Sequence, residues 1–346
     1  MKSGVEHLAS IIAAHLREWD SSPAFVELAI FATDDATSIA ETLNVFCRQM
    51  LGAPVRRGLF HRSSIGSVTG VVLEDGRSVV IKAHQPEQSR QFLAEIVRIQ
   101  SYLAERRIFA TKVIAGPAPL GQGLAIVEQF TDVGATADAH EPHVRRALAL
   151  ALHTIVAACD PFVASTSLKP ALLGGVEGAL WPKPHSKLFD FAATSHGAGW
   201  IDEIAAIAIE RIMPAGRRVI GHSDWRQEHV RFIGNAPVAA YDWDSLCCGP
   251  EPTLLGIVAH AFCADYSRRG HRQAPTIEEA RAFKSDYEAA RGRAFTPDES
   301  RLCGAAFAYA CAYTARCVHA QGKDGRAAPG TFHHLLWTER ENLLQL

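Results

Sequence analysis

Residues 219–250 read VIGHSDWRQEHVRFIGNAPVAAYDWDSLCCGP, and this stretch decides the fold prediction for the chain. Short apolar runs alternate with small and polar residues, which is typical of a β-hairpin. The expected parts are an apolar lead-in, a polar turn at 222–229, a strand at 230–233, a turn at Gly234 and Asn235, and a strand at 238–241.

Two acidic residues fall at the same end of this predicted hairpin. Asp224 lies in the polar turn before the first strand, and Asp242 comes just after the second strand. Such a pair suits metal-assisted phosphoryl transfer, in which one carboxylate orients an attacking hydroxyl and the other holds a divalent ion on the phosphates. The hairpin is therefore the first candidate for a catalytic site.

Composition excludes several other classes of protein. The 346 residues carry a formal net charge of -2, which gives no general attraction to nucleic acid or to an anionic membrane. The eight cysteines show no zinc-site spacing, so we expect a reduced, cytoplasmic protein. The longest apolar run, residues 147–159, is shorter than the roughly 20 residues of a membrane-spanning helix.

A strand-like region precedes the hairpin by more than a hundred residues. Residues 55–83 predict strands with a small-residue turn at 63–67, a second turn at Asp75 and Gly76, and a last strand that ends in Lys82. Small side chains let backbone N–H groups approach phosphate oxygens. Most such turns are nevertheless only turns, and this one alone decides nothing.

The next segment, residues 88–106, predicts a helix whose apolar stripe is bordered by Glu95. A carboxylate that becomes buried needs a cationic partner, and Lys82 on the preceding strand is the natural one. The alternative is that Glu95 reaches solvent and Lys82 is an ordinary charge on an edge strand.

Two further strands are expected at 108–114 and 123–130. At the start of the chain, residues 1–50 predict two or three helices. The region after residue 130 is mainly helical. This order predicts an α+β protein with a small antiparallel-sheet lobe that carries one key helix, joined to a larger helical lobe. We place the first domain at 1–130 and the second at 131–346, with backbone groups near the joint free to bind an adenine.

Helical periodicity dominates the second domain outside the hairpin. The expected helices are 144–159, 200–212, 254–268, 277–291, 298–321 and 331–346. Acidic residues in this part could line a groove for a cationic acceptor, although such residues are usually solvated. They are Asp244, Glu251, Asp265 and Asp286.

The order of these parts resembles the aminoglycoside phosphotransferase and choline kinase-like branch of the protein kinase-like fold, over residues 55–260. Its most specific portion is HSDWRQEH followed by YDWD. The resemblance implies that Asp224 is the catalytic base, that Asp242 binds magnesium, and that Lys82, fixed by Glu95, holds the α- and β-phosphates. The other nucleotide-binding residues that it implies are Ser64, Gly66 and Ser67 over the phosphates and the connector from Glu128 to Phe130.

This sequence departs from the family pattern at two positions in the turn. Ser223 replaces a glycine, which is tolerable unless the backbone there needs a positive φ. His229 stands where the family has a metal-binding asparagine. Imidazole prefers softer metals than magnesium, so either His229 is a metal ligand, with manganese as the alternative ion, or it packs and hydrogen-bonds within the turn.

The resemblance implies a small-molecule kinase that uses ATP and Mg²⁺, or Mn²⁺, to phosphorylate a hydroxyl of a small metabolite or antibiotic. The alternative is a nucleotide-binding relative that is weakly active or inactive and acts through a partner protein. Neither nucleic acid nor membrane is expected as a partner, and the sequence predicts no oligomeric state. The identity of the acceptor is open.

Overall fold

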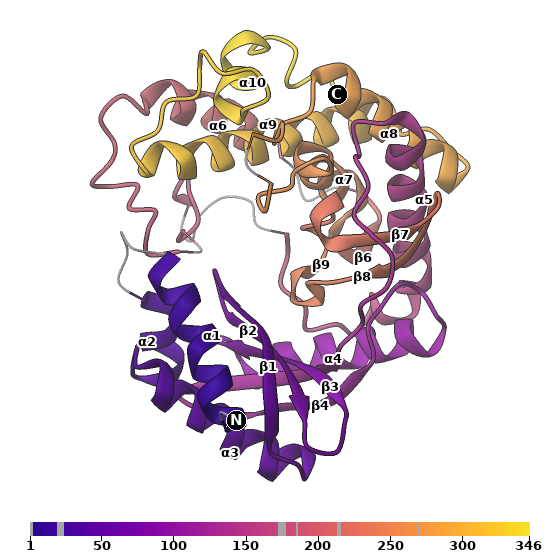
Figure 1. Cartoon of the computed structure of the whole chain (residues 1–346). Helices are drawn as coiled ribbons and strands as arrows, with labels where there is room; N and C mark the ends of the chain where they lie inside the picture. The colour runs from indigo at the N-terminus through magenta and orange to yellow at the C-terminus, as the bar shows by residue number, and fades with distance from the viewer. Residues whose placement is uncertain (1–2, 19–23, 172–177, 185, 213–215, 269) are drawn as a thin grey trace. The chain divides into compact units, whose positions relative to one another are not determined.

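The computed structural model describes residues 3–18, 24–171, 178–184, 186–212, 216–268 and 270–346. The chain divides into two compact units (Figure 1). The N-terminal unit comprises Met1–Arg106 and Thr111–Asp132, and the C-terminal unit comprises Arg107–Ala110 and Val133–Leu346. A sequence boundary at residue 130 therefore lies within two residues of the end of the N-terminal unit.

In its described residues, the N-terminal unit has three helices, a five-stranded antiparallel sheet and one helix inserted between strands. The sheet order is β1-β2-β3-β5-β4. The elements are α1 (Gly4–Glu18), α2 (Phe25–Phe31), α3 (Ala36–Leu51), β1 (Val55–Ser63), β2 (Ser67–Leu73), β3 (Ser78–His84), α4 (Arg90–Glu105), β4 (Val113–Leu120) and β5 (Gly123–Gln129).

Local sequence explains several of these boundaries. Gly76 has a φ of 88° in the β2–β3 turn, a conformation that costs glycine little. The neighbouring Asp75 accepts a hydrogen bond from the backbone N–H of Arg77. Ser89 caps α4 by accepting a hydrogen bond from the N–H of Phe92.

The strand expected at 108–114 is wrong, because β4 begins at Val113 and continues to Leu120. Arg107 and Phe109 have positive φ angles of 57° and 54°, which interrupt an extended strand. The missed part, GPAPL, reads as a turn because of its prolines. An edge strand tolerates proline, since its outer N–H groups need no partner, and β4 is at the edge of the sheet.

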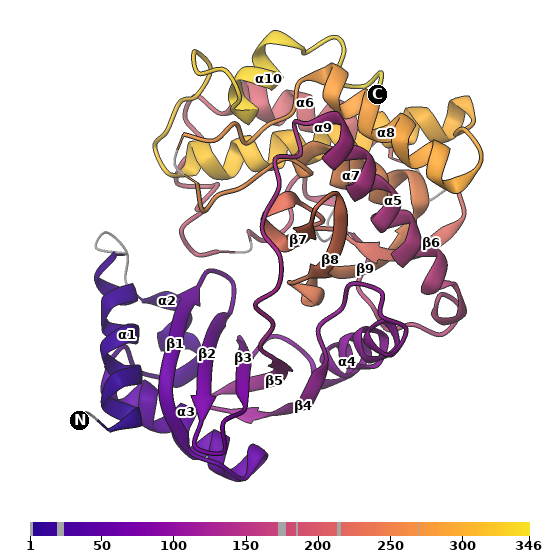
Figure 2. The ribbon, with the colours of Figure 1, turned by 45° about the vertical axis from the view of Figure 1, so that its right-hand side comes forward.

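Helices α1 to α3 pack together against one face of the sheet (Figure 2). Their fully buried residues include Leu8, Ile12 and Leu43. These side chains share one apolar core with alternate residues of the strands, among them Val79 and Ile81. The helices before residue 50, whose role the sequence left open, therefore form part of the core of the N-terminal unit.

The opposite face of the sheet carries Lys82 and Glu128, two of the residues expected to meet a nucleotide. Lys82 lies between Ile81 and Ala83, which both point into the helix-covered core, so its own side chain projects from the other face. Glu128 is two residues from Ile126, the register partner of Lys82, and shares that face. Helix α4 is on this side too, because its Gln100 binds Thr111, which donates to Glu128.

The C-terminal unit is mainly helical and contains two small antiparallel strand pairs, β6-β9 and β7-β8. Threonine capping boxes begin two of its helices, α8 at Thr276 and α9 at Thr296. The elements are α5 (Pro142–Ala158), α6 (Gly199–Glu210), β6 (Arg218–His222), β7 (Val230–Ile233), β8 (Ala236–Ala240), β9 (Leu246–Pro250), α7 (Glu251–Ala261), α8 (Ile277–Arg291), α9 (Pro297–Ala320) and α10 (Phe332–Thr338).

The architecture agrees with the predicted α+β fold: a small antiparallel sheet with one inserted helix, and a larger helical unit. Helices α7 and α10 end earlier than periodicity predicts, at Ala261 and Thr338. Among the described residues, no helix is both long enough and apolar enough to cross a membrane.

Burial of α1 in the core makes a stability prediction. Leu8→Ala should lower the free energy of unfolding by about 2 to 5 kcal/mol, because it removes a fully buried side chain from packed surroundings. Val45→Ala, at a residue 48% exposed on α3, should change it by less than about 0.5 kcal/mol. Urea denaturation measures both, and equal effects would show that α1 is not part of the core.

Candidate active site

The β6-β9 pair is the base of the predicted catalytic turn. Sequence reading gave only an apolar lead-in here, yet residues 218–222 pair antiparallel with residues 246–250, and His222 lies opposite Leu246. The Ser223 hydroxyl and N–H both donate to the carbonyl of Ser245, at 2.8 and 3.0 Å. Ser223 has no positive φ, so serine replaces the family glycine without strain and ties the turn to the following loop.

His222 is a buried anchor for the turn. Its Nε2 lies 3.0 Å from the carbonyl oxygen of Tyr241, to which it donates. The ring packs edge-on against Trp225 and Trp243, with centroid distances of 5.6 and 5.7 Å. Burial, followed by the nearby His229, lowers the pKa of His222. A neutral His222 therefore fixes the backbone that precedes Asp224.

Asp242 has an unusual backbone conformation. It follows β8 with a φ of 64°, in the left-handed region that non-glycine residues seldom adopt. The Tyr241 N–H, one residue earlier, donates to the carbonyl of His229, and the Ser245 hydroxyl lies 3.2 Å from the Asp242 carboxylate. Strained backbone of this kind is concentrated at functional sites, and here it turns the Asp242 side chain toward the end of the hairpin.

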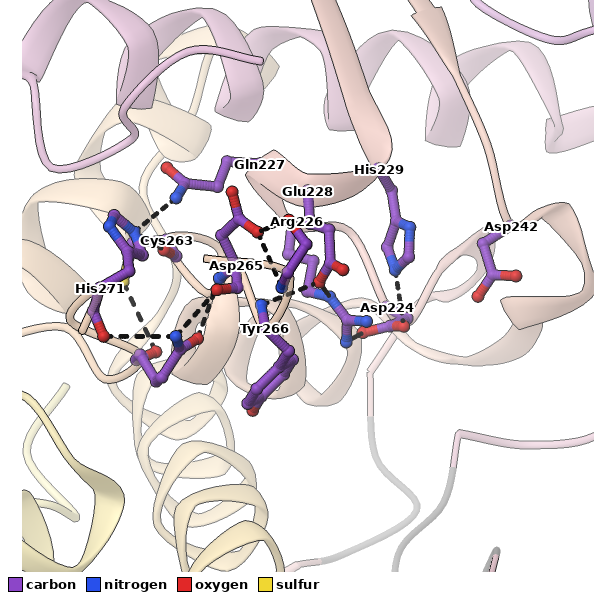
Figure 3. Close-up of polar contacts among 12 residues, drawn as sticks. Asp224, Arg226, Gln227, Glu228, His229, Asp242, Cys263, Asp265, Tyr266 and His271 are labelled. Carbon is purple, nitrogen blue, oxygen red and sulfur yellow. Dashed lines mark hydrogen bonds and ion pairs between the residues drawn. The ribbon is translucent and has the colours of Figure 1, made fainter. Parts of the chain in front are cut away.

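Asp224, His229 and Asp242 converge at this end of the β7-β8 hairpin (Figure 3). Each offers one ligand atom, and these atoms all lie within 4.8 Å of one another. The two carboxylates and one imidazole fit a divalent cation, because carboxylate oxygens suit magnesium and manganese, and imidazole suits the softer ions. His229 Nε2 is also 3.1 Å from Asp224 Oδ2, so its hydrogen bond to Asp224 is the second role open to it.

Arg226 belongs to the same site and was missed by sequence analysis. Its Nη1 donates to Asp224 Oδ1 at 2.6 Å and its Nε donates to Glu228 at 3.2 Å (Figure 3). The guanidinium lies 5.0 Å above the Tyr266 ring. Burial opposes ionisation of Asp224, but Arg226 and then His229 outweigh it and hold the pKa of Asp224 well below its usual range. The available signal was a cation two residues after the acid in the turn.

Gln227 fastens the back of the turn. Its Oε1 accepts from the Ala139 N–H, and its own N–H donates to the carbonyl of Phe262. Its side-chain amide also contacts His271, which belongs to a second group of possible metal ligands with Asp138 and His140. In that group a guanidinium nitrogen of Arg272 is 2.8 Å from His140 Nδ1, and this cation disfavours a metal there.

The groove expected from four acidic residues is not supported, because three of them make structural contacts. Glu251 is buried and accepts from the Tyr287 hydroxyl at 2.9 Å and from Arg291 at 2.7 Å. Asp265 is buried against Ser267, and Asp286 pairs with Arg145. The partners of Glu251 and Asp286 lie 36 to 141 positions away in the chain, and for this reason the sequence could not reveal them.

In the N-terminal unit, Lys82 and Glu95 are both buried. Arg98 makes two hydrogen bonds to the Glu95 carboxylate, at 2.8 and 2.6 Å, so this acid has a cationic partner on its own helix. Lys82 and α4 share a face of the sheet, while their pairing through Glu95 stays a prediction. The Glu128 carboxylate accepts from the Thr111 hydroxyl at 2.7 Å, and the Glu128 backbone pairs with Val80 of β3 and Val113 of β4 inside the sheet, so its contact with adenine stays a prediction.

The other expected nucleotide-binding residues lie at the ends of strands. Ser64 and Gly66 form the β1–β2 turn, in which the Ser64 N–H donates to the Gly66 carbonyl at 3.1 Å. Ser67 pairs with Ala83 and is 1% exposed, so its hydroxyl faces the helix-covered core. The Phe130 N–H donates to the Ser78 carbonyl, so a backbone hydrogen bond from Phe130 to adenine would have to use the Phe130 carbonyl.

Comparisons with family models and with curated protein sequences found no match. Solved structures do match. Spectinomycin phosphotransferase APH(9)-Ia, in complex with ADP and spectinomycin, has a TM-score of 0.56 and 12% identity, covering 87% of this chain and 98% of that chain. Amicoumacin kinase hAmiN, solved with AMP-PNP and Ca²⁺, has a TM-score of 0.50 and 12% identity, covering 80% and 91%.

An aminoglycoside phosphotransferase from Alicyclobacillus acidocaldarius also matches, with a TM-score of 0.50 and 13% identity, covering 86% of this chain and 96% of that chain. At these identities the likeness concerns the fold. The predicted protein kinase-like fold is confirmed, and the matches extend over nearly the full length of each solved structure.

Arg226→Met should raise the pKa of Asp224, because it removes the cation while burial remains. A carboxylate whose folded pKa is lowered stabilises the fold above its unfolded pKa, and this stability is lost as pH falls through the folded pKa. The variant should therefore be less stable than wild type near pH 7, and the difference in stability should shrink as the pH falls, because a smaller pKa difference between folded and unfolded Asp224 leaves less stability to lose. Unfolding measured from pH 7 down to pH 3 checks this, with Arg226→Lys as the charge-retaining control. Coincident curves for the methionine variant and wild type would contradict it.

Proposed function

We propose, on the premise that the chain has the fold of the aminoglycoside phosphotransferases, that it transfers the γ-phosphate of ATP to a hydroxyl of a small metabolite or antibiotic. The observation that carries this proposal is the convergence of Asp224, His229 and Asp242 at one end of the β7-β8 hairpin. Two solved structures with the same fold contain ADP or AMP-PNP, and they act on small antibiotics.

In the proposed reaction, Asp224 orients the acceptor hydroxyl and takes its proton. The hydroxyl oxygen forms a bond to the γ-phosphorus, the bond between that phosphorus and the β,γ-bridging oxygen breaks, and ADP leaves with the electron pair. The low pKa of Asp224 makes it a weak base. This is compatible with the loose transition state of phosphoryl transfer, in which positioning and charge neutralisation matter more than early proton removal.

Asp242 would hold the divalent ion, with its carboxylate oriented by Ser245. A bound Mg²⁺ or Mn²⁺ would neutralise charge on the phosphates. Lys82 would hold the α- and β-phosphates, as the family resemblance implies. Arg226 keeps Asp224 ionised, and its guanidinium also bridges Asp224 to Glu228, which limits the rotation of both carboxylates.

Asp224→Asn should lower kcat by about 100- to 10,000-fold, the usual contribution of a positioned general base. Asp242→Ala should abolish metal-dependent turnover, because the cation loses its carboxylate. Coupled ADP release, measured over a panel of hydroxylated amines, sugars and antibiotics, gives both values. Asp298→Asn, at a carboxylate that is 86% exposed, is the matched control. Unchanged turnover in Asp224→Asn with a productive acceptor would remove Asp224 from the mechanism.

Substitution of His229 distinguishes its two possible roles, which are ligation of the metal ion and the hydrogen bond to Asp224. If its Nε2 ligates the ion, His229→Asn should shift the metal preference from Mn²⁺ toward Mg²⁺, because asparagine offers an oxygen. Ratios of kcat/KM in the two metals measure this shift. A variant with wild-type metal ratios and a lower kcat would contradict ligation and assign His229 to the hydrogen bond with Asp224.

A nucleotide-binding protein without transferase activity is the second candidate function. It is favoured by the same His229, whose Nε2 contacts Asp224 in place of the family asparagine. Phosphate transfer, or slow ATP hydrolysis that disappears in Asp242→Ala, excludes it. Nucleotide binding alone does not distinguish the two functions, since both require ATP.

A further inference from the structure

A buried polar cluster joins helices α1 and α2 to the β1-β2 hairpin of the N-terminal unit. His15 lies in the last turn of α1, Glu27 lies in α2, and His61 and Ser63 lie at the end of β1. His15, Glu27 and His61 are each no more than 3% exposed. Burying ionisable groups costs several kcal/mol, a cost that apolar side chains would avoid. We therefore expect the hydrogen bonds of this cluster to hold a specific local geometry.

His15 holds Ser63 through two contacts. Its Nε2 accepts from the Ser63 backbone N–H at 3.2 Å and lies 2.8 Å from the Ser63 hydroxyl. A ring nitrogen that accepts a hydrogen bond carries no proton. His15 must therefore be neutral for its Nε2 to accept from Ser63. Burial, followed by the charge of His61, lowers the pKa of His15 and favours this neutral form.

Glu27 holds the same strand end through His61. Its carboxylate is 3.3 Å from His61 Nε2, and His61 Nδ1 is 2.9 Å from the Thr69 hydroxyl on β2. Burial opposes ionisation of Glu27, but its hydrogen bonds, of which that from His61 is the strongest, together outweigh burial and lower the pKa of Glu27. The two strands of the hairpin are thus tied to each other and to α2 next to the turn.

Ser63 is the residue immediately before the turn at 64–66, which carries the proposed phosphate-covering groups. On its other side, the turn is held by Gln85, whose amide donates to the Ile65 carbonyl at 2.5 Å. Gly66 has no room for a side chain, because a Cβ would lie 2.7 Å from the Ala83 carbonyl oxygen. The turn is therefore fixed on one side by β3 and on the other by α1 and α2.

We propose that His15 and Glu27 are positioning residues that hold the turn at 64–66 in the shape that receives the nucleotide phosphates. Helices α1 and α2 would then contribute to nucleotide binding by supplying these two residues. This inference rests on the proposed function for the identity of the ligand. Its geometry, in contrast, lies wholly within the N-terminal unit.

The test compares His15→Ala, His15→Gln and Glu27→Gln in the full-length protein, with His7→Ala on the exposed side of α1 as the matched control. Calorimetry with AMP-PNP and Mg²⁺ measures nucleotide affinity, and steady-state kinetics measure KM for ATP and kcat separately. Hydrogen–deuterium exchange of the amides at 64–66, without nucleotide, reports the turn directly.

His15→Ala should weaken nucleotide binding and raise KM for ATP by about tenfold, as expected when one buried hydrogen bond is lost. It should leave kcat within about twofold and speed exchange at 64–66. His15→Gln should recover most of the affinity, because an amide oxygen can accept from the Ser63 N–H. His7→Ala should match wild type.

A folded His15→Ala protein with wild-type affinity and wild-type exchange would overturn the inference, and so would a glutamine variant as weak as the alanine variant. If His15→Ala does not fold, Glu27→Gln decides, since it keeps the side-chain shape and should show the same loss. A wild-type protein that binds no nucleotide would defeat the proposed function. The exchange comparison would still decide whether His15 holds the turn.

Discussion

Asp224 and Asp242 place two negative charges at one end of the β7-β8 hairpin, and the surrounding structure compensates for their repulsion. Arg226 and His229 provide part of the compensation through contacts of 2.6 and 3.1 Å to Asp224. Asp242 instead has a positive φ itself, and its carboxylate is oriented by the Ser245 hydroxyl. This asymmetry is consistent with two roles, because a carboxylate held by a guanidinium orients a substrate group, whereas one aimed into a shared ligand cluster suits a cation.

The scaffold around this pair is rigid for identifiable reasons. His222, Trp225 and Trp243 pack as one buried aromatic group, and the Ser223 hydroxyl and backbone N–H both donate to the Ser245 carbonyl. In the N-terminal unit the sheet separates two environments: α1 to α3 cover one face, and the other face presents Lys82 and Glu128 beside α4. The polar cluster of His15, Glu27 and His61 lies at the edge of the helix-covered face, where the β1–β2 turn begins.

The sequence predicted those parts whose determinants are local. Strand β7 and helix α8 have the predicted bounds, because a Gly-Asn turn and a threonine capping box mark them. Strand β4 was misplaced, since its prolines are tolerated only at the sheet edge, a property of topology. The site was predicted at Asp224, His229 and Asp242, while Arg226 was missed, and Glu251 was assigned to a groove although it is a buried partner of Tyr287 and Arg291. The contacts of Glu251 join residues 36 and 40 positions apart and leave no periodic signal.

The central claim is that this carboxylate pair supports metal-dependent phosphoryl transfer from ATP. Phosphorus-31 NMR of the wild-type protein with ATP, Mg²⁺ or Mn²⁺ and pooled hydroxylated amines, sugars and antibiotics tests it most directly. The account predicts that the γ-phosphate resonance declines while a phosphomonoester resonance grows in equal amount, only when a divalent ion is present. A γ-phosphate resonance that stays unchanged with either metal and every acceptor pool, in a protein shown to bind ATP, would contradict it.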